Sequence, residues 1–103
     1  MMKEREINMP YIFPPSKEIT AASKRAAIRE AFLELLIKEK KQKISVKCGL
    51  RAFDQIMYMS EYSYAANPKI DGYLSIAGCS VVIVRDFELD PWKVVYEGEV
   101  IFN

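Results

Sequence analysis

The residues that most enzymes use for catalysis are scarce in this chain. It contains no histidine, which removes the commonest general base, the commonest metal ligand and every serine–histidine or cysteine–histidine pair. Its four glycines stand singly, at positions 49, 72, 78 and 98, so no glycine-rich phosphate loop is present. We therefore expect no catalytic residues and a protein that is not an enzyme.

Carboxylates and thiols are the remaining groups with metal or nucleophilic chemistry. Asp86, Glu88 and Asp90 alternate along the chain and offer oxygen ligands that suit Ca²⁺ or Mg²⁺. The glycine and the distal glutamate of an EF-hand are missing, however, which favours a solvated acidic loop. Cys48 and Cys79 each lie in an apolar run and form no CxxC motif, as expected of free, buried thiols in a reducing compartment. We expect no metal and no cofactor.

An apolar segment near the N-terminus is the first candidate for binding a protein. Residues 1–16 contain three prolines around Tyr11, Ile12 and Phe13, and a residue that precedes proline avoids the helical conformation. The segment is therefore predicted to be an extended arm. Its apolar side chains either fold back on the domain or reach a neighbouring subunit.

A group of tyrosines is the second candidate. Tyr58, Tyr62 and Tyr64 occur close together with Met57 and Met59, and both residue types are enriched at protein interfaces. The alternative is a loop that packs its own rings onto the sheet.

A basic run is the third candidate surface. Its members are Lys38, Lys40, Lys41, Lys43, Lys47 and Arg51. Such a run can contact the phosphates of nucleic acid or an acidic protein. Because no recognised DNA- or RNA-binding pattern accompanies it, a solvated helix end or a protein interface is the favoured interpretation, with nucleic-acid binding as the alternative.

The charge is unevenly distributed, although the net charge is only +1. Residues 17–51 carry ten basic residues against four acidic ones, whereas residues 52–103 carry three against eight. If the fold keeps the two parts apart, this polarity favours head-to-tail contact between copies or contact with an acidic partner. If the fold interleaves them, the asymmetry disappears.

Helical and strand patterns place these candidate residues. From the plausible N-cap Ser16 to Gly49 no glycine or proline interrupts the chain, which predicts a long helix ending near residues 41–42. Residues 43–48 alternate polar and apolar side chains and predict a strand, and residues 50–60 predict a second, shorter helix. Residues 61–72 contain two turn-forming dipeptides and predict a loop.

The last third of the sequence is rich in strand-forming residues. Residues 73–84 form an apolar run in which the β-branched block 81–84 is typical of a strand covered on both faces. Residues 92–96 and 99–102 predict either a tight hairpin or one bulged strand around Gly98. This order predicts the α+β class, with a single small domain at residues 17–103 in which two helices pack on a mainly antiparallel sheet.

The length and hydropathy of the sequence indicate the size of the core and the expected cellular location of the protein. A chain of 103 residues should bury one modest core, and half of its residues are hydrophobic, as in globular domains. The N-terminus lacks the apolar region of a signal peptide, and no apolar stretch reaches the roughly 18 residues of a membrane span. We expect a cytoplasmic protein with no membrane partner.

Several short motifs occur in the order found in one family. Residues 27–32 (AIREAF) precede the strand at 44–46, residues 50–56 (LRAFDQI) follow it, and residues 72–74 (GYL), 78–84 (GCSVVIV) and 98–102 (GEVIF) close the series. This order resembles the apical, capsomer-centre part of the major capsid protein fold of tailed phages and encapsulins. The chain is too short to contain that family's elongated arm and peripheral domain, so the resemblance implies a minimal relative and brings no catalytic residues.

These patterns together favour a binding function. We expect a non-enzymatic structural or protein-interaction protein, a phage-derived accessory virion component or assembly factor that self-associates or docks on a larger assembly in the host cytoplasm or the virion. One alternative is a small phage-encoded inhibitor of a host enzyme. Another is a nucleic-acid-binding module that uses residues 38–51.

Overall fold

Two helices form where apolar residues recur at helical spacing. The computed structural model describes residues 17–103, with the side chains of residues 22–103, so the predicted arm with Tyr11, Ile12 and Phe13 lies outside it. Helix α1 (Lys17–Glu39) ends two residues before the predicted limit, because Lys40 adopts a left-handed conformation with φ of 56°. Helix α2 (Leu50–Met57) is also shorter than predicted, ending before Ser60.

In the described part of the chain, six strands form one mixed, mostly antiparallel sheet. The strands are β2 (Lys43–Cys48), β3 (Tyr62–Asn67), β4 (Ile70–Ile76), β5 (Cys79–Arg85), β6 (Val94–Tyr96) and β7 (Glu99–Phe102). Their order across the sheet is β3-β4-β5-β2-β6-β7, and the central pair, β2 with β5, is parallel. The other four pairs are antiparallel. The predicted α+β class with two helices on a mainly antiparallel sheet is confirmed.

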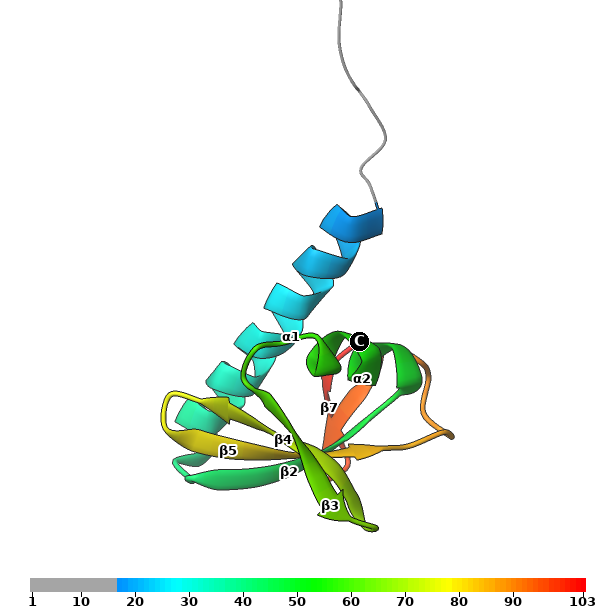
Figure 1. The fold of residues 1–103 in the computed structure, drawn as a ribbon. Helices are drawn as coiled ribbons and strands as arrows, with labels where there is room; N and C mark the ends of the chain where they lie inside the picture. The colour runs from blue at the N-terminus through cyan, green and yellow to red at the C-terminus, as the bar shows by residue number, and fades with distance from the viewer. Residues whose placement is uncertain (1–16) are drawn as a thin grey trace, which may run out of the picture.

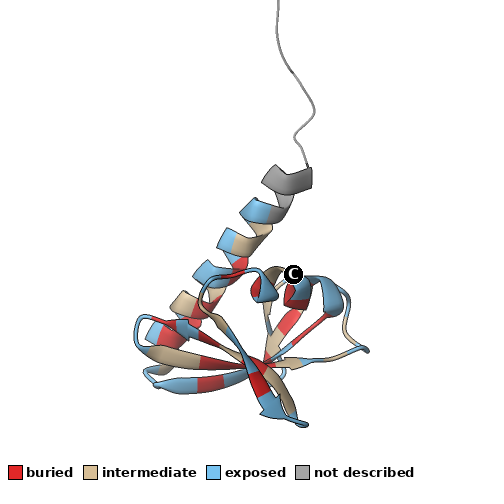
Figure 2. Cartoon of the chain, viewed as in Figure 1, coloured by how far each residue is buried: buried red, intermediate tan, exposed pale blue. Residues whose placement is uncertain are grey.

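Both helices cover the same face of this sheet (Figure 1). The buried core lies between them and the strands, as the red segments in Figure 2 indicate. The largest fully buried side chains of this core include Ile28 and Phe32 from α1, Ile56 from α2, and Leu74 and Ile83 from the sheet. The N-terminal part of α1 extends beyond the sheet, and Ile28 is the first buried residue among those of its side chains that the structure describes.

The predicted loop at residues 61–72 is wrong. This segment forms β3, a turn, and the start of β4, and it pairs with a register shift between Tyr64 and Asn67. The turn-forming pair Asn67-Pro68 lies at the tip of this hairpin, where the Asn67 side chain accepts a hydrogen bond from the backbone N–H of Lys69 at 2.8 Å. The second pair, Asp71-Gly72, lies inside β4 rather than in a turn.

Residues 73–84 fold as two strands joined at Ala77 and Gly78, which have φ of 51° and 78°. Positive φ at both central residues is the geometry of a tight hairpin turn. The residues around Gly98 form the other such hairpin, with φ of 49° at Glu97 and 84° at Gly98, so the hairpin alternative is the correct one there.

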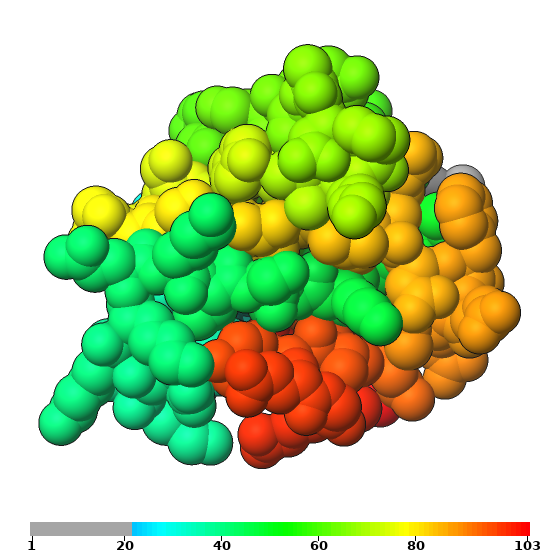
Figure 3. All heavy atoms as spheres, turned by 90° about the horizontal axis from the view of Figure 1, so that it is seen from below, coloured from blue at the N-terminus to red at the C-terminus, as the bar shows by residue number. Residues whose placement is uncertain are grey.

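The prediction that residues 81–84 are covered on both faces is also wrong. Val81 and Ile83 belong to the core on the side of the helices, whereas Val82 and Val84 alternate with them and project from the opposite face. Figure 3 shows the molecule from this opposite side, where neither α1 nor α2 covers the strands. Val82 is nevertheless buried there, flanked in register by Ser45 and Tyr73 on the neighbouring strands. A β-branched run therefore reflects central position in the sheet here, not a second covering layer.

Candidate protein-interaction surface

A set of aromatic and charged side chains gathers where β5 ends beside α2. We call it the aromatic–arginine cluster and define it as Phe53, Tyr62, Asp71, Arg85 and Phe87. Consecutive members touch: the Arg85 guanidinium lies 5.0 Å from the centre of the Phe53 ring and 5.7 Å from that of Phe87, and the Phe53 and Tyr62 rings meet edge to face at 6.2 Å. The members come from α2, β3, β4, β5 and the loop after β5, so the fold alone brings them together.

Asp71 holds Arg85 in place from two directions. Its Oδ1 accepts a hydrogen bond from Arg85 Nε at 3.0 Å, and its Oδ2 accepts one from the Arg85 backbone N–H at 2.7 Å. The stacked rings fix the guanidinium further, yet the Arg85 side chain stays 43% exposed. An arginine that is already ordered loses little conformational entropy when a partner binds it.

Tyr62 links the cluster to strand β4. Its hydroxyl donates a hydrogen bond to the Asp71 carbonyl oxygen at 2.9 Å, and its ring lies directly over Gly72. A Cβ atom built on Gly72 would come within 2.4 Å of the Tyr62 ring, so only glycine leaves room for it. Burial, with a smaller effect of the Asp71 charge, raises the pKa of the Tyr62 phenol.

Two rings at this surface remain open to solvent. Tyr64, which pairs in register with Gly72, is 80% exposed, and Phe87 is 73% exposed. Tyr58 is also exposed, but it lies at the C-terminal end of α2, where the guanidinium of Arg25 from α1 lies 6.0 Å from the centre of its ring. The predicted tyrosine set thus divides into Tyr64 beside the cluster, Tyr62 within it, and Tyr58 apart.

Sequence reasoning missed Asp71, Arg85 and Phe87 as members of a site. Their proximity depends on the pairing of β4 with β5, which sets Gly72 opposite Ile83 and so brings the start of β4 to the end of β5. No local pattern encodes that pairing. The one available signal was the segment Arg85-Asp86-Phe87, where a cation and an aromatic ring flank a turn residue after a buried strand.

The basic run is divided by the fold. Four of its members surround the turn between α1 and β2: Lys38, Lys40, Lys41 and Lys43. Lys47 lies further along the helix-free face, and Arg51 lies in the first turn of α2 on the helix side. Lys47 lines a hollow of about 340 Å³ on the helix-free face. The other residues that line this hollow are Ser45, Val84, Asp86, Leu89, Val95, Glu97 and Gly98.

Acidic residues from the second half of the chain meet basic residues from the first. Arg29 pairs with Glu61 at 2.8 Å, and Lys38 lies 4.0 Å from Glu99. A hydrogen bond to Tyr96 and the nearby Glu97 raise the pKa of Lys41. The fold interleaves the two charge populations at these points, which weakens the polarity seen along the sequence.

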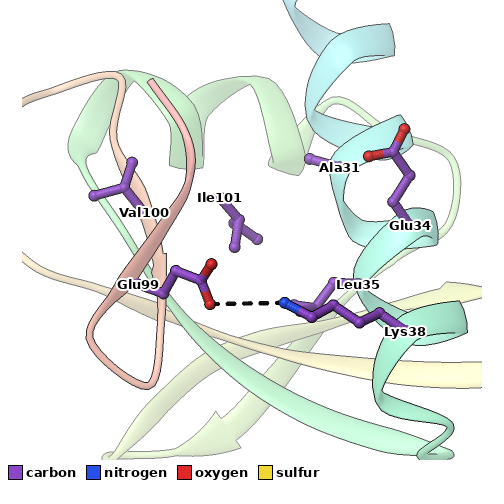
Figure 4. A pocket seen from close by; sticks show the side chains of 7 residues that line it. All are labelled: Ala31, Glu34, Leu35, Lys38, Glu99, Val100 and Ile101. Atoms are coloured by element: carbon purple, nitrogen blue, oxygen red, sulfur yellow. Dashed lines mark ion pairs between the residues drawn. The ribbon is translucent and has the colours of Figure 1, made fainter.

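A shallow groove separates α1 from the edge strand β7. It holds about 190 Å³ and is lined by Ala31, Glu34, Leu35, Lys38, Glu99, Val100 and Ile101. Figure 4 shows Leu35 and Ile101 between the helix and the strand, with the charged side chains at the rim. Among the residues that the structure describes, β7 is the last strand at its end of the sheet.

The thiol of Cys48 is buried in the core, and the carboxylates of Asp86 and Asp90 have hydrogen-bond or ion-pair partners within their own loop. Cys48 is fully buried, and this burial, with the charge of Asp71, raises its pKa to about 12, so the nucleophilic thiolate is disfavoured. In the acidic loop, Asp86 accepts a hydrogen bond from the Glu88 backbone N–H, and Asp90 pairs with Lys93 at 3.6 Å. Within the part of the chain that the structure describes, no three potential metal ligands gather.

The fold and these surfaces define the class of the protein: a small α+β domain whose mixed sheet has one helix-covered and one helix-free face. Comparisons of the chain with protein-family models, with curated proteins and with solved structures give no significant match. Neither α1 nor α2 has the length and hydropathy needed to cross a membrane.

Proposed function

We propose that this protein is a non-enzymatic interaction protein that binds a protein partner through the aromatic–arginine cluster and the adjacent Tyr64. The observation that carries the proposal is Arg85, which two hydrogen bonds to Asp71 and two aromatic rings order in advance. Tyrosine and arginine are the residue types that most often dominate binding energy at interfaces. The partner's complementary group is a carboxylate or a backbone carbonyl.

The finer proposal rests on the capsid-fold resemblance. It makes the protein a phage-derived accessory virion component or assembly factor, present in the host cytoplasm or the virion, whose partner is a larger assembly or a second copy. The alternative is an inhibitor that binds one host enzyme through the same surface. Light scattering over a range of protein and salt concentrations, with recovery of bound proteins from host cells, separates these cases.

Substitution of the exposed rings tests the proposal. The double variant Tyr64→Ser with Phe87→Ser removes two solvent-facing rings without touching the core, and Ile37→Ser removes an equally exposed apolar side chain from α1 as the matched control. We expect the double variant to bind the recovered partner at least about tenfold more weakly, which corresponds to about 1.4 kcal/mol. Unchanged binding by the double variant, or equal loss in the Ile37→Ser control, would contradict the proposal.

A further inference from the structure

β3 is the last strand at one end of the sheet in the described part of the chain, with β4 as its neighbour. In Figure 3 the lime-green segment that contains β3 forms a margin of the molecule, and no other segment lies beyond it in this view. A strand in this position presents backbone N–H and C=O groups that can pair with a strand of another chain. The edge of β3 is therefore a candidate surface for pairing through the backbone.

The register of β3 on β4 shows which backbone groups face outward. The backbone N–H of Ser75 donates a hydrogen bond to the Glu61 carbonyl oxygen at 3.2 Å, and Ser63 lies opposite Tyr73 in the same register. Hydrogen-bonded pairs recur at every second residue of an antiparallel ladder, so Ser63 and Tyr73 form the next such pair. The N–H and C=O of Tyr64 therefore point away from β4, toward the free edge.

The side chains of β3 do not protect this edge against pairing. Its sequence, YSYAAN, contains no charged residue and no proline, which are the residues that commonly block an edge strand. The register shift after Tyr64 makes the second half of the strand irregular, which limits regular pairing to the first half. At the other end of the sheet β7 begins with the charged Glu99, which lies 4.0 Å from Lys38 of α1. The neutral edge of β3 is the better suited of the two to accept another strand.

We propose that β3 pairs antiparallel with β3 of a second copy of this chain, about a twofold axis at Tyr64. The N–H and C=O of each Tyr64 then bond the C=O and N–H of the other, and the two sheets become one continuous sheet. The two Tyr64 rings, each 80% exposed in a single copy, lie side by side across the axis as an aromatic cross-strand pair.

The neutral character of β3 favours a second copy as the occupant. At a twofold axis each side chain meets its own copy, and like charges directly opposite each other are destabilising. β3 carries no charge, so this cost is absent. One short strand buries little area, so the dimer is weak and forms at high protein concentration. The pairing uses backbone groups of β3 and does not depend on the proposed function, which uses side chains of the aromatic–arginine cluster.

Two replacements of Tyr64 test this pairing. Tyr64→Pro and Tyr64→Thr both remove the ring, but only proline also removes the outward N–H, and an edge strand tolerates proline at such a position. Sedimentation of the unchanged protein from about 10 µM to about 1 mM should show a monomer–dimer equilibrium. We expect Tyr64→Pro to raise the dissociation constant of the dimer at least about tenfold more than Tyr64→Thr does. Raised salt should leave the dimer unchanged, because no charged pair holds it.

Disulfide trapping gives a second measurement, which does not require the proline variant to fold. In a Cys79→Ser background, which leaves only the buried Cys48, the variant Tyr64→Cys is compared with Ile37→Cys, whose side chain is 67% exposed on α1. The proposed pairing sets the two Cα atoms at position 64 about 5.5 Å apart, within the range of a disulfide. We expect Tyr64→Cys to form the bridge between two molecules at least about tenfold faster than Ile37→Cys at the same protein concentration.

Any of four results would overturn the proposal: a strict monomer at about 1 mM, a dimer that salt dissociates, equal weakening by the two Tyr64 replacements, or equal bridging rates. Circular dichroism verifies that each variant is folded. The proposed function is tested separately, because Tyr64→Pro and Tyr64→Thr lose the same ring and should weaken binding to a partner of the cluster equally. Failure of the β3 pairing would leave the proposed function standing, and loss of the proposed function would leave the pairing standing.

Discussion

Replacement of Gly49 by alanine tests how the acidic loop is attached to the domain. Gly49 precedes α2 in an ordinary extended conformation, with φ of −66°, so its backbone does not require glycine. Glycine is required by the lack of space, because a Cβ atom at this position would lie 2.1 Å from the Asp90 carbonyl oxygen and 2.7 Å from the Pro91 carbonyl oxygen. Both contacts are with backbone, so the loop as a whole must retreat by roughly 1 Å to restore van der Waals separation.

That retreat strains three hydrogen bonds. Gly49 N–H donates to the Lys93 carbonyl at 2.8 Å, and the N–H groups of Arg51 and Ala52 both donate to the Pro91 carbonyl at 2.9 Å. At about 1 kcal/mol each, their loss lowers the free energy of unfolding by about 3 kcal/mol. For a domain of this size that corresponds to a fall in Tm of roughly 12–24 °C.

Thermal and urea unfolding followed by circular dichroism measure this effect. Gly78→Ala is the matched control, because a Cβ atom there meets no neighbour within 4 Å and the cost is limited to the positive φ, about 1–2 kcal/mol. If Gly49→Ala is no more destabilising than Gly78→Ala, the close approach of the loop is refuted. The outcome bears on the site, because the same loop carries Phe87.

Two further predictions concern ionisable groups. At pH 8 iodoacetamide should modify Cys79 in the folded protein at least about 100-fold faster than Cys48, because burial raises the pKa of the Cys48 thiol to about 12. Mass spectrometry measures both rates, and comparable rates would contradict the buried position of Cys48. The pKa of the Glu61 carboxyl is lowered by a hydrogen bond from the backbone N–H of Glu61 and by the interaction with Arg29. The ionised carboxylate therefore stabilises the fold at pH values above the ordinary pKa of 4.5, and this stabilisation is lost as the pH falls through the lowered pKa. Glu61→Gln should therefore reduce the loss of stability on acidification, and an unchanged dependence in urea unfolding at several pH values would refute this.

The elements that the sequence predicted well are those whose apolar residues recur with a clear helical or strand period. The stripe of Ile28, Phe32 and Leu35 defines α1, and strict alternation defines β2, whose residues are buried at every second position. β3 was missed because its residues include serine, alanine and asparagine, which give no apolar alternation. Its place as an edge strand on β4 is a tertiary effect that a local pattern does not contain.

The candidate site was less predictable than the fold. The tyrosine composition pointed to the region of the aromatic–arginine cluster, where Tyr62 and Tyr64 lie, but composition did not separate the half-buried ring from the exposed one. Strand alternation does not separate them either, because Tyr62 and Tyr64 lie two residues apart on the same face of β3. Tyr62 is the more buried because its ring packs against Phe53 of α2. Asp71 and Arg85 are fourteen residues apart and meet through the pairing of β4 with β5, which non-local contacts determine.

The helix-free face of the sheet is the obvious rival to the aromatic–arginine cluster as the binding surface. An antiparallel sheet can leave one face in water when that face carries polar side chains. Here Lys43, Ser45 and Lys47 occupy the exposed positions of the central strand β2, and the hollow beside Lys47 is lined by Asp86 and Glu97. Burying these charges against a partner would carry a desolvation cost that the partner's own groups would have to offset. At the cluster the two charges, Arg85 and Asp71, are already paired with each other, and the guanidinium is stacked on rings, so a partner can cover them at a lower cost. The contrast between this charged face and the neutralised, aromatic cluster favours the cluster as the proposed binding surface.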